Sequence, residues 1–152
     1  MSNPTGRLQL ALNVKDLDEA VAFYTKMFGV PVHKRKPGYA NFAIQDPPLK
    51  LVLFEDPDAS ERLNHLGVEV FGDAEVTAAT ERLKDGGMRH LVEDETTCCY
   101  AKQNKVWAQE PDGMRWEWYH VLDDTDAFGR EAPRVDEAPE AESATRAPGL
   151  RS

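Results

Sequence analysis

The 152-residue sequence predicts an α+β fold built from two copies of one βαβββ module. Each half of the chain reads as a strand, then a helix, then further strands. Equivalent features of the halves recur after 56 or 57 residues, which pairs Gln9 with His65, Asp16 with Asp73, and Gly29 with Gly86. A period of this size is typical of a repeated structural unit. Because one helix cannot cover both faces of a sheet, the two sheets are expected to pair into a curved half-barrel around a cleft.

The first module is expected over residues 7–56. Asp16 followed by Glu19 has the spacing of a capping box, so a helix should begin there. The apolar residues that follow form one helical stripe, and Gly29 supplies the stop. The strands of this module are expected over residues 8–14, 39–44 and 50–54, with turn residues at 46–48.

The second module is expected over residues 62–121. Asp73 is predicted to cap its helix, which should end at Gly86. After Leu122 the periodic patterns give way to acidic residues, proline and alanine, so 123–152 are expected to form a disordered acidic tail. Residues 1–122 would then be one domain. The strands of this module are expected over residues 63–70, 96–101, 105–109 and 115–121.

The net charge and the hydrophobicity of the sequence argue against a nucleic-acid-binding protein and against a membrane-spanning protein. A net charge of −9 disfavours nucleic acid, whose phosphates would be repelled. No apolar run is long enough to cross a bilayer. The segment from Met1 to Arg7 lacks the pattern of a secretory signal, so a cytoplasmic location is expected. The sequence fits either a monomer or a homodimer.

Three side chains are predicted to hold a metal ion. Gln9 and His65 are polar residues at equivalent positions in the first strand of each module. Glu117 lies between two tryptophans on the last strand and should point to the face opposite them. Alignment of the modules puts Leu51 opposite Glu117, so a fourth protein ligand is missing and coordination positions stay open.

The donor types alone do not select one metal. An amide oxygen, an imidazole and a carboxylate are compatible with Fe(II), Mn(II), Ni(II) or Zn(II). The remaining histidines, His33, His90 and His120, lack the matched positions and are interpreted as surface or supporting residues.

The only cysteines, Cys98 and Cys99, are adjacent and are interpreted as free thiols in a reducing compartment. Two neighbouring thiolates can chelate one thiophilic centre such as As(III), Sb(III), Cd(II) or Hg(II). In a regular strand they would point to opposite faces, so an irregular strand is expected here. Residues 103–105 are predicted to form a turn that lets this segment act as a lid, with Lys105 favouring the thiolates or binding an anion.

Three segments of the sequence are distinctive: KRKPGYANFAI at 34–44, LNHLGVEV at 63–70 and TTCC at 96–99. Over about residues 7–121 the chain resembles the vicinal-oxygen-chelate superfamily, which includes glyoxalase I, bleomycin- and fosfomycin-resistance proteins and extradiol dioxygenases. More narrowly, the three segments resemble the subgroup of ArsI carbon–arsenic lyases and cadmium-induced proteins.

The resemblance implies Fe(II)- and O₂-dependent cleavage of the carbon–arsenic bond of trivalent methyl- and aryl-arsenicals, with release of arsenite. It places the metal on Gln9, His65 and Glu117, although many relatives have histidine where Gln9 stands. It places the substrate's arsenic on Cys98 and Cys99. Ni(II), Mn(II), Zn(II) or Co(II) are possible replacements in vitro. The other residues expected to contact the substrate are Tyr39, Phe42, Tyr100 and Lys105.

Three other functions remain open from the sequence. The thiols could sequester cadmium or arsenite without turnover, or the chain could be a glyoxalase-like enzyme of Zn(II), Ni(II) or Mn(II). The glyoxalase-like reading requires a carboxylate at Leu51 or an external thiol cosubstrate. A drug-sequestering dimer is the third.

Overall fold

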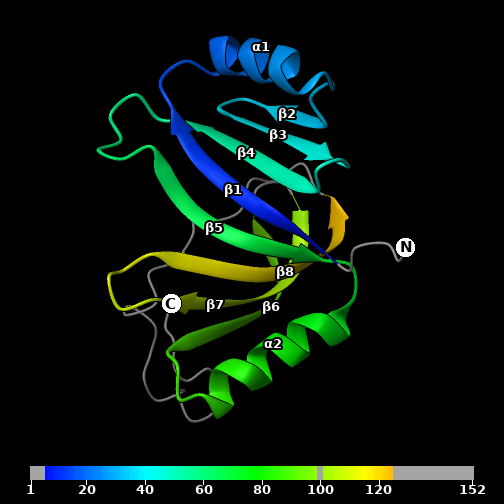
Figure 1. The fold of residues 1–152 in the computed structure, drawn as a ribbon, viewed down its shortest axis with the longest axis vertical. Coiled ribbons are helices and arrows are strands. Elements are labelled where there is room, and N and C mark those ends of the chain that lie inside the picture. The colour runs from blue at the N-terminus through cyan, green and yellow to red at the C-terminus, as the bar shows by residue number, and fades with distance from the viewer. Residues whose placement is uncertain (1–5, 99–100, 125–152) are drawn as a thin grey trace. The chain divides into compact units, whose positions relative to one another are not determined.

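A computed structural model describes residues 6–98 and 101–124, and the side chains of residues 6–93 and 103–122. The predicted tail therefore lies almost wholly outside the described residues. The chain divides into two compact units, residues 1–67 and 68–152, with the boundary inside β5. The elements are β1 (Gly6–Val14), α1 (Leu17–Phe28), β2 (Lys34–Lys36), β3 (Tyr39–Ile44), β4 (Leu49–Glu55), β5 (Leu63–Val70), α2 (Asp73–Asp85), β6 (His90–Cys98), β7 (Ala101–Gln109) and β8 (Arg115–Asp124) (Figure 1).

In the first unit, α1 covers one face of the sheet (Figure 1). The strand order is β2-β3-β4-β1, followed by β5, with β1 and β4 parallel and the other described pairs antiparallel. Alternate residues of each strand point toward the helix. The core under α1 is formed by Val14, Leu17, Val21, Ala40, Phe42, Ile44, Leu51 and Leu53.

The ends of α1 confirm the sequence prediction. The Asp16 carboxylate accepts a hydrogen bond from the backbone N–H of Glu19 at 3.0 Å. Gly29 ends the helix with φ of 70°, a backbone conformation that favours glycine. Glu55 at the end of β4 also accepts from the N–H of Leu17 at 2.9 Å, which ties the helix start to the sheet.

In the second unit, β8, β7 and β6 form an antiparallel sheet and α2 packs on one face of it (Figure 1). The predicted strands at 96–101 and 105–109 have the wrong bounds, because β6 begins at His90 and β7 at Ala101. The sequence pattern missed these earlier starts because polar residues, among them His90, Gln103 and Lys105, occupy buried positions in the strands. The core under α2 is formed by Val70, Val76, Ala79, Leu83, Val106 and Ala108.

Asp73 does not cap α2 as predicted. Gly72 occupies the N-cap position without a side-chain hydrogen bond, and Asp73 is the first helical residue. Its carboxylate instead accepts hydrogen bonds from His120 Nδ1 at 3.0 Å and from Asn104 Nδ2 at 2.9 Å. The residue thus links the start of the helix to β7 and β8.

The hydrogen bonds of Asp73 with His120 and Asn104 should make a pH-dependent contribution to the stability of the fold. The hydrogen bonds from His120 and then Asn104 lower the pKa of Asp73 below its ordinary 3.8. A lowered folded-state pKa stabilises the fold above the unfolded value, and the contribution is lost as pH falls through the folded value. Asp73→Asn should therefore unfold at lower urea concentration than the wild type at neutral pH. The difference should shrink with acidification below 3.8, and a difference independent of pH would contradict this assignment.

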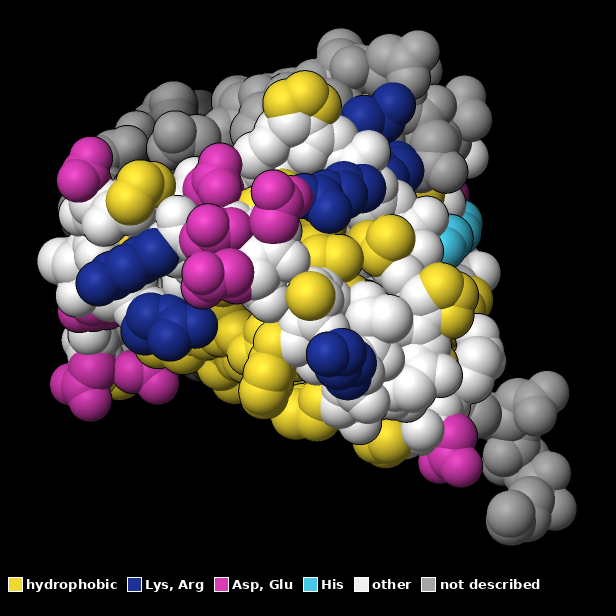
Figure 2. All heavy atoms as spheres, turned by 90° about the horizontal axis from the view of Figure 1, so that it is seen from above, with side chains coloured by type: hydrophobic (Ala, Val, Ile, Leu, Met, Phe, Trp, Pro, Cys, Tyr) yellow, Lys and Arg dark blue, Asp and Glu magenta, His cyan; other side chains and the backbone are white. Residues whose placement is uncertain are grey.

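The surface on the α1 side mixes apolar and charged side chains. Phe23 and Met27, one turn apart on α1, are 58% and 55% exposed. Nearby, Arg35 pairs with Asp18. Figure 2 shows hydrophobic side chains reaching the surface between acidic and basic ones. Within the described part of the chain, neither helix is long and apolar enough to cross a membrane.

Candidate metal centre

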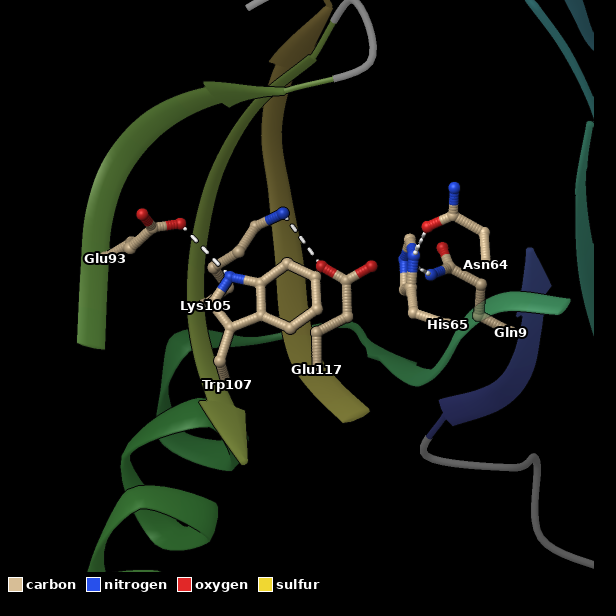
Figure 3. Close-up of polar contacts among 7 residues, drawn as sticks. All are labelled: Gln9, Asn64, His65, Glu93, Lys105, Trp107 and Glu117. Atoms are coloured by element: carbon tan, nitrogen blue, oxygen red, sulfur yellow. Dashed lines mark hydrogen bonds and ion pairs between the residues drawn. The ribbon is translucent and has the colours of Figure 1, made fainter. Parts of the chain in front are cut away.

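Gln9 on β1 and His65 on β5 lie side by side in the first unit. Each side chain is buried, with 4% of each residue exposed, and the two Nε2 atoms are 3.1 Å apart (Figure 3). The two polar residues at matching repeat positions, which sequence analysis assigned to one metal, are thus brought together by the fold.

The second nitrogen of His65 is held by its neighbour. His65 Nδ1 lies 2.9 Å from Asn64 Oδ1 (Figure 3). Because an amide oxygen can only accept, a hydrogen bond between these atoms requires the ring proton on Nδ1. In the neutral ring, Nε2 then has a lone pair and accepts a hydrogen bond from the Gln9 amide. Metal-binding histidines usually donate their other N–H in this way.

These two residues fit a divalent metal. His65 presents the lone pair that a metal requires, and a rotation of the Gln9 amide about its last torsion would present the amide oxygen beside it. A nitrogen and an oxygen donor suit first-row divalent ions. Among the described side chains, no group of three or more His, Cys, Asp and Glu residues gathers, so any site on these residues depends on the amide of Gln9.

Glu117 in the second unit is buried and paired with Lys105. Lys105 Nζ donates to Glu117 Oε1 at 2.8 Å, and the two side chains are 1% and 5% exposed (Figure 3). The Lys105 ammonium also lies 5.3 Å from the ring centre of Trp107 and 5.8 Å from that of Tyr119. Trp107 Nε1 in turn donates to Glu93 at 3.2 Å. The carboxylate therefore faces a buried cation that also lies near two aromatic rings.

Strand register explains why these side chains share a face. Lys105 pairs with Tyr119 and Trp107 with Glu117, so all four point to one side of the sheet. Val106 and Ala108 of β7 point to the opposite side, into the α2 core. As predicted, Glu117 points away from its flanking tryptophan Trp118, which packs against that core.

The predicted turn at 103–105 is wrong, because these residues lie inside β7. Gln103 and Lys105 are buried, and sequence reasoning interpreted two buried polar side chains as loop composition. The alternation of Lys105 with Trp107 on one face, opposite Val106, was the available signal for a strand.

The residues predicted to contact the substrate lie in different environments. Tyr39 is buried, and its hydroxyl accepts from Asn41 Nδ2 at 2.8 Å. Phe42 points the other way, into the α1 core, with 0% exposed, so its side chain is not positioned to contact a substrate. Cys98 ends β6 opposite Ala101, and the side chains of the cysteine pair and Tyr100 lie outside the described residues. The irregularity of β6 falls earlier than expected, between Glu93 and Thr96.

Leu51 is not the counterpart of Glu117. Its side chain is 1% exposed and packs under α1, on the face opposite Gln9. Lys50, which pairs with Gln9 in register, occupies the face that Glu117 occupies in the second unit. The repeat alignment was displaced by one residue, which exchanges the two faces of a strand. The corrected position still carries no carboxylate.

The remaining histidines take supporting positions. His90 Nδ1 donates to the backbone carbonyl of Met88 at 2.8 Å, and His120 pairs with Asp73. His33 lines an open groove of about 520 Å³ with Val30, Ile44 and Asp46.

The strand and helix order, together with a family comparison, defines the class of protein. Residues 6–118 match the model of the Glyoxalase/Bleomycin resistance protein/Dioxygenase superfamily. The chain belongs to this superfamily, which confirms the predicted α+β fold class.

Two curated relatives are close in sequence. The chain is 52% identical over 137 residues to the cadmium-induced protein CadI of Mycobacterium bovis, covering 90% of each chain. It is 50% identical over 125 residues to a trivalent organoarsenical cleaving enzyme of Thermomonospora curvata, covering 82% of this chain and 83% of the relative.

A solved structure shows the same fold at low identity. The Mn(II)-bound glyoxalase from Novosphingobium aromaticivorans superimposes with a TM-score of 0.59 at 18% identity. The match covers 91% of this chain and 46% of that one.

Proposed function

We propose that this chain is a carbon–arsenic lyase that cleaves trivalent methyl- and aryl-arsenicals to arsenite with Fe(II) and O₂. The observation that carries the proposal is the 50% identity to a trivalent organoarsenical cleaving enzyme, combined with a buried histidine whose Nε2 lies 3.1 Å from the Gln9 amide nitrogen. The adjacent thiols Cys98 and Cys99 support the same substrate class.

The proposed metal ligands are Gln9, His65 and Glu117. Gln9 and His65 are neighbours in the first unit, and the assignment of Glu117 as the third ligand rests on the family resemblance. Fe(II) bound by three protein ligands would supply open coordination positions for dioxygen chemistry.

The cysteine pair is proposed to anchor the substrate. A trivalent arsenical R–As(OH)₂ reacts with two thiols to form two As–S bonds and release two waters, and the carbon substituent R stays on arsenic. Holding arsenic by two bonds fixes the direction of the C–As bond, and such positioning lowers a barrier by several kcal/mol, up to about 7–11. Tyr39, Tyr100 and Lys105 are proposed to line the space for R. Free thiols fit a reducing cytoplasm, which is the proposed location. The protein is proposed to act there as a monomer or a homodimer.

A second function is favoured by a specific observation, the 52% identity to a cadmium-induced protein. In that case the thiols of Cys98 and Cys99 would bind Cd(II) or As(III) without turnover. The two functions share the thiols and differ in the need for dioxygen.

Oxygen uptake separates the two functions. An oxygen electrode should record uptake when phenylarsenite is added to the Fe(II)-loaded protein, and none when inorganic arsenite is added. Thiol-dependent binding of phenylarsenite with no uptake would favour sequestration and contradict the lyase.

A further inference from the structure

A relay of hydrogen bonds through the Asn13 and Asn64 side-chain amides connects the backbone carbonyl of Glu61 to His65. Asn13 Nδ2 lies 3.0 Å from the carbonyl oxygen of Glu61, Asn64 Nδ2 lies 3.0 Å from Asn13 Oδ1, and Asn64 Oδ1 lies 2.9 Å from His65 Nδ1. All these residues belong to the first unit, and Figure 3 shows Asn64 turned toward His65.

The donor and acceptor groups allow the hydrogen bonds of this relay to run in one direction only. A backbone carbonyl only accepts, so Asn13 must turn its NH₂ toward Glu61 and its oxygen toward Asn64. That oxygen also only accepts, so Asn64 must present its NH₂ to Asn13 and its oxygen to His65. The ring proton is therefore required on Nδ1, and the Nε2 lone pair faces Gln9.

Hydrogen bonds with Arg62 hold Asn13, the first residue of this hydrogen-bond relay, in place. The N–H of Asn13 donates to the carbonyl of Arg62 at 2.7 Å, and Arg62 Nε donates to the carbonyl of Asn13 at 2.9 Å. The segment that supplies the Glu61 carbonyl is thus tied to β1 by three hydrogen bonds around Asn13.

We propose that Asn13 and Asn64 are positioning residues that hold the His65 proton on Nδ1 and so reserve Nε2 for the metal. The inference rests on the proposed metal site. It assigns a role to Asn13, which connects to His65 through Asn64. Without the Asn13 oxygen, the Asn64 amide can turn its NH₂ toward the ring, which would favour the tautomer with the proton on Nε2. That tautomer carries its lone pair on Nδ1 and has none on Nε2, the nitrogen that faces Gln9.

The test is the tautomer of His65 in the metal-free protein, measured by ¹⁵N NMR of the ring nitrogens at a pH where the ring is neutral. The wild type should carry its proton on Nδ1. Asn13→Leu and Asn64→Leu should shift the population toward Nε2–H. Asn13→Asp and Asn64→Asp each keep an acceptor oxygen toward the next group, and they should retain the wild-type tautomer.

Metal affinity gives the second readout. In anaerobic titration with Co(II) alone, Asn64→Leu should bind about 10–100-fold more weakly than the wild type, and the Asp variants should not show this loss. The more distant Asn13→Leu should lose about 3- to 10-fold. Circular dichroism identifies the variants that fold.

The inference is overturned if the wild type carries its proton on Nε2, a result that needs no variant. It is also overturned if folded Leu variants keep the wild-type tautomer. Failure of the proposed function looks different, because the tautomers would follow the prediction while Fe(II)-loaded protein released no arsenite.

Discussion

Replacing Lys105 by methionine is expected to lower the free energy of unfolding by about 3–5 kcal/mol in metal-free protein. Lys105 is 1% exposed, and its ammonium lies 2.8 Å from Glu117 Oε1. Methionine fills similar space but removes the positive charge, which leaves the buried carboxylate without this partner. Urea unfolding in the presence of a chelator measures the loss.

A double variant separates charge from packing. Lys105→Met/Glu117→Leu replaces the buried pair by apolar groups, and such replacements are often neutral or stabilising. The double variant should therefore recover most of the stability lost in the single variant. Lys84→Met, at an exposed position of α2, is the matched control and should change stability by less than about 0.5 kcal/mol. A Lys105→Met protein as stable as this control would contradict the assigned ion pair.

Replacing Cys98 or Cys99 by serine is expected to lower kcat/KM for arsenite release from phenylarsenite by at least about a hundredfold. A hydroxyl is a much weaker ligand for trivalent arsenic than a thiolate, so each variant would hold the substrate by one As–S bond and lose control of the C–As direction. Steady-state kinetics of the Fe(II)-loaded variants measure the effect.

The neighbouring substitution Thr97→Ser controls for disturbance of the segment and should retain activity. Co(II) affinity of both cysteine variants should match the wild type, because the proposed metal ligands are elsewhere. If either single serine variant keeps wild-type kcat/KM, the two-thiol anchor is wrong.

The pairing of Gln9 with His65 could be predicted because the repeat placed two polar residues at one structural position. The fold brings them to 3.1 Å, as the repeat implied. The capping of α1 was equally accessible, since Asp16 and Gly29 act through local backbone geometry. Helix caps and repeat symmetry can be predicted from the sequence because each depends on only a few residues.

The burial of Lys105 could not be predicted in the same way. A lysine in a polar stretch is usually exposed, and only the register of β7 with β8 shows that Lys105 reaches Glu117. Leu51 illustrates a second limit, because an error of one residue in aligning two strands exchanges their faces. The pairing of distant strands determines both the burial of Lys105 and the face on which Leu51 lies. A single sequence carries little information on how distant strands pair.

The most direct test of the central claim is arsenic speciation after anaerobic loading with Fe(II), followed by addition of O₂ and methylarsenite or phenylarsenite. We expect arsenite release that requires Fe(II), O₂, both cysteines and Glu117, so Cys98→Ser/Cys99→Ser and Glu117→Ala should release none. Recovery of unchanged organoarsenical from the fully loaded wild type would contradict the proposed lyase activity.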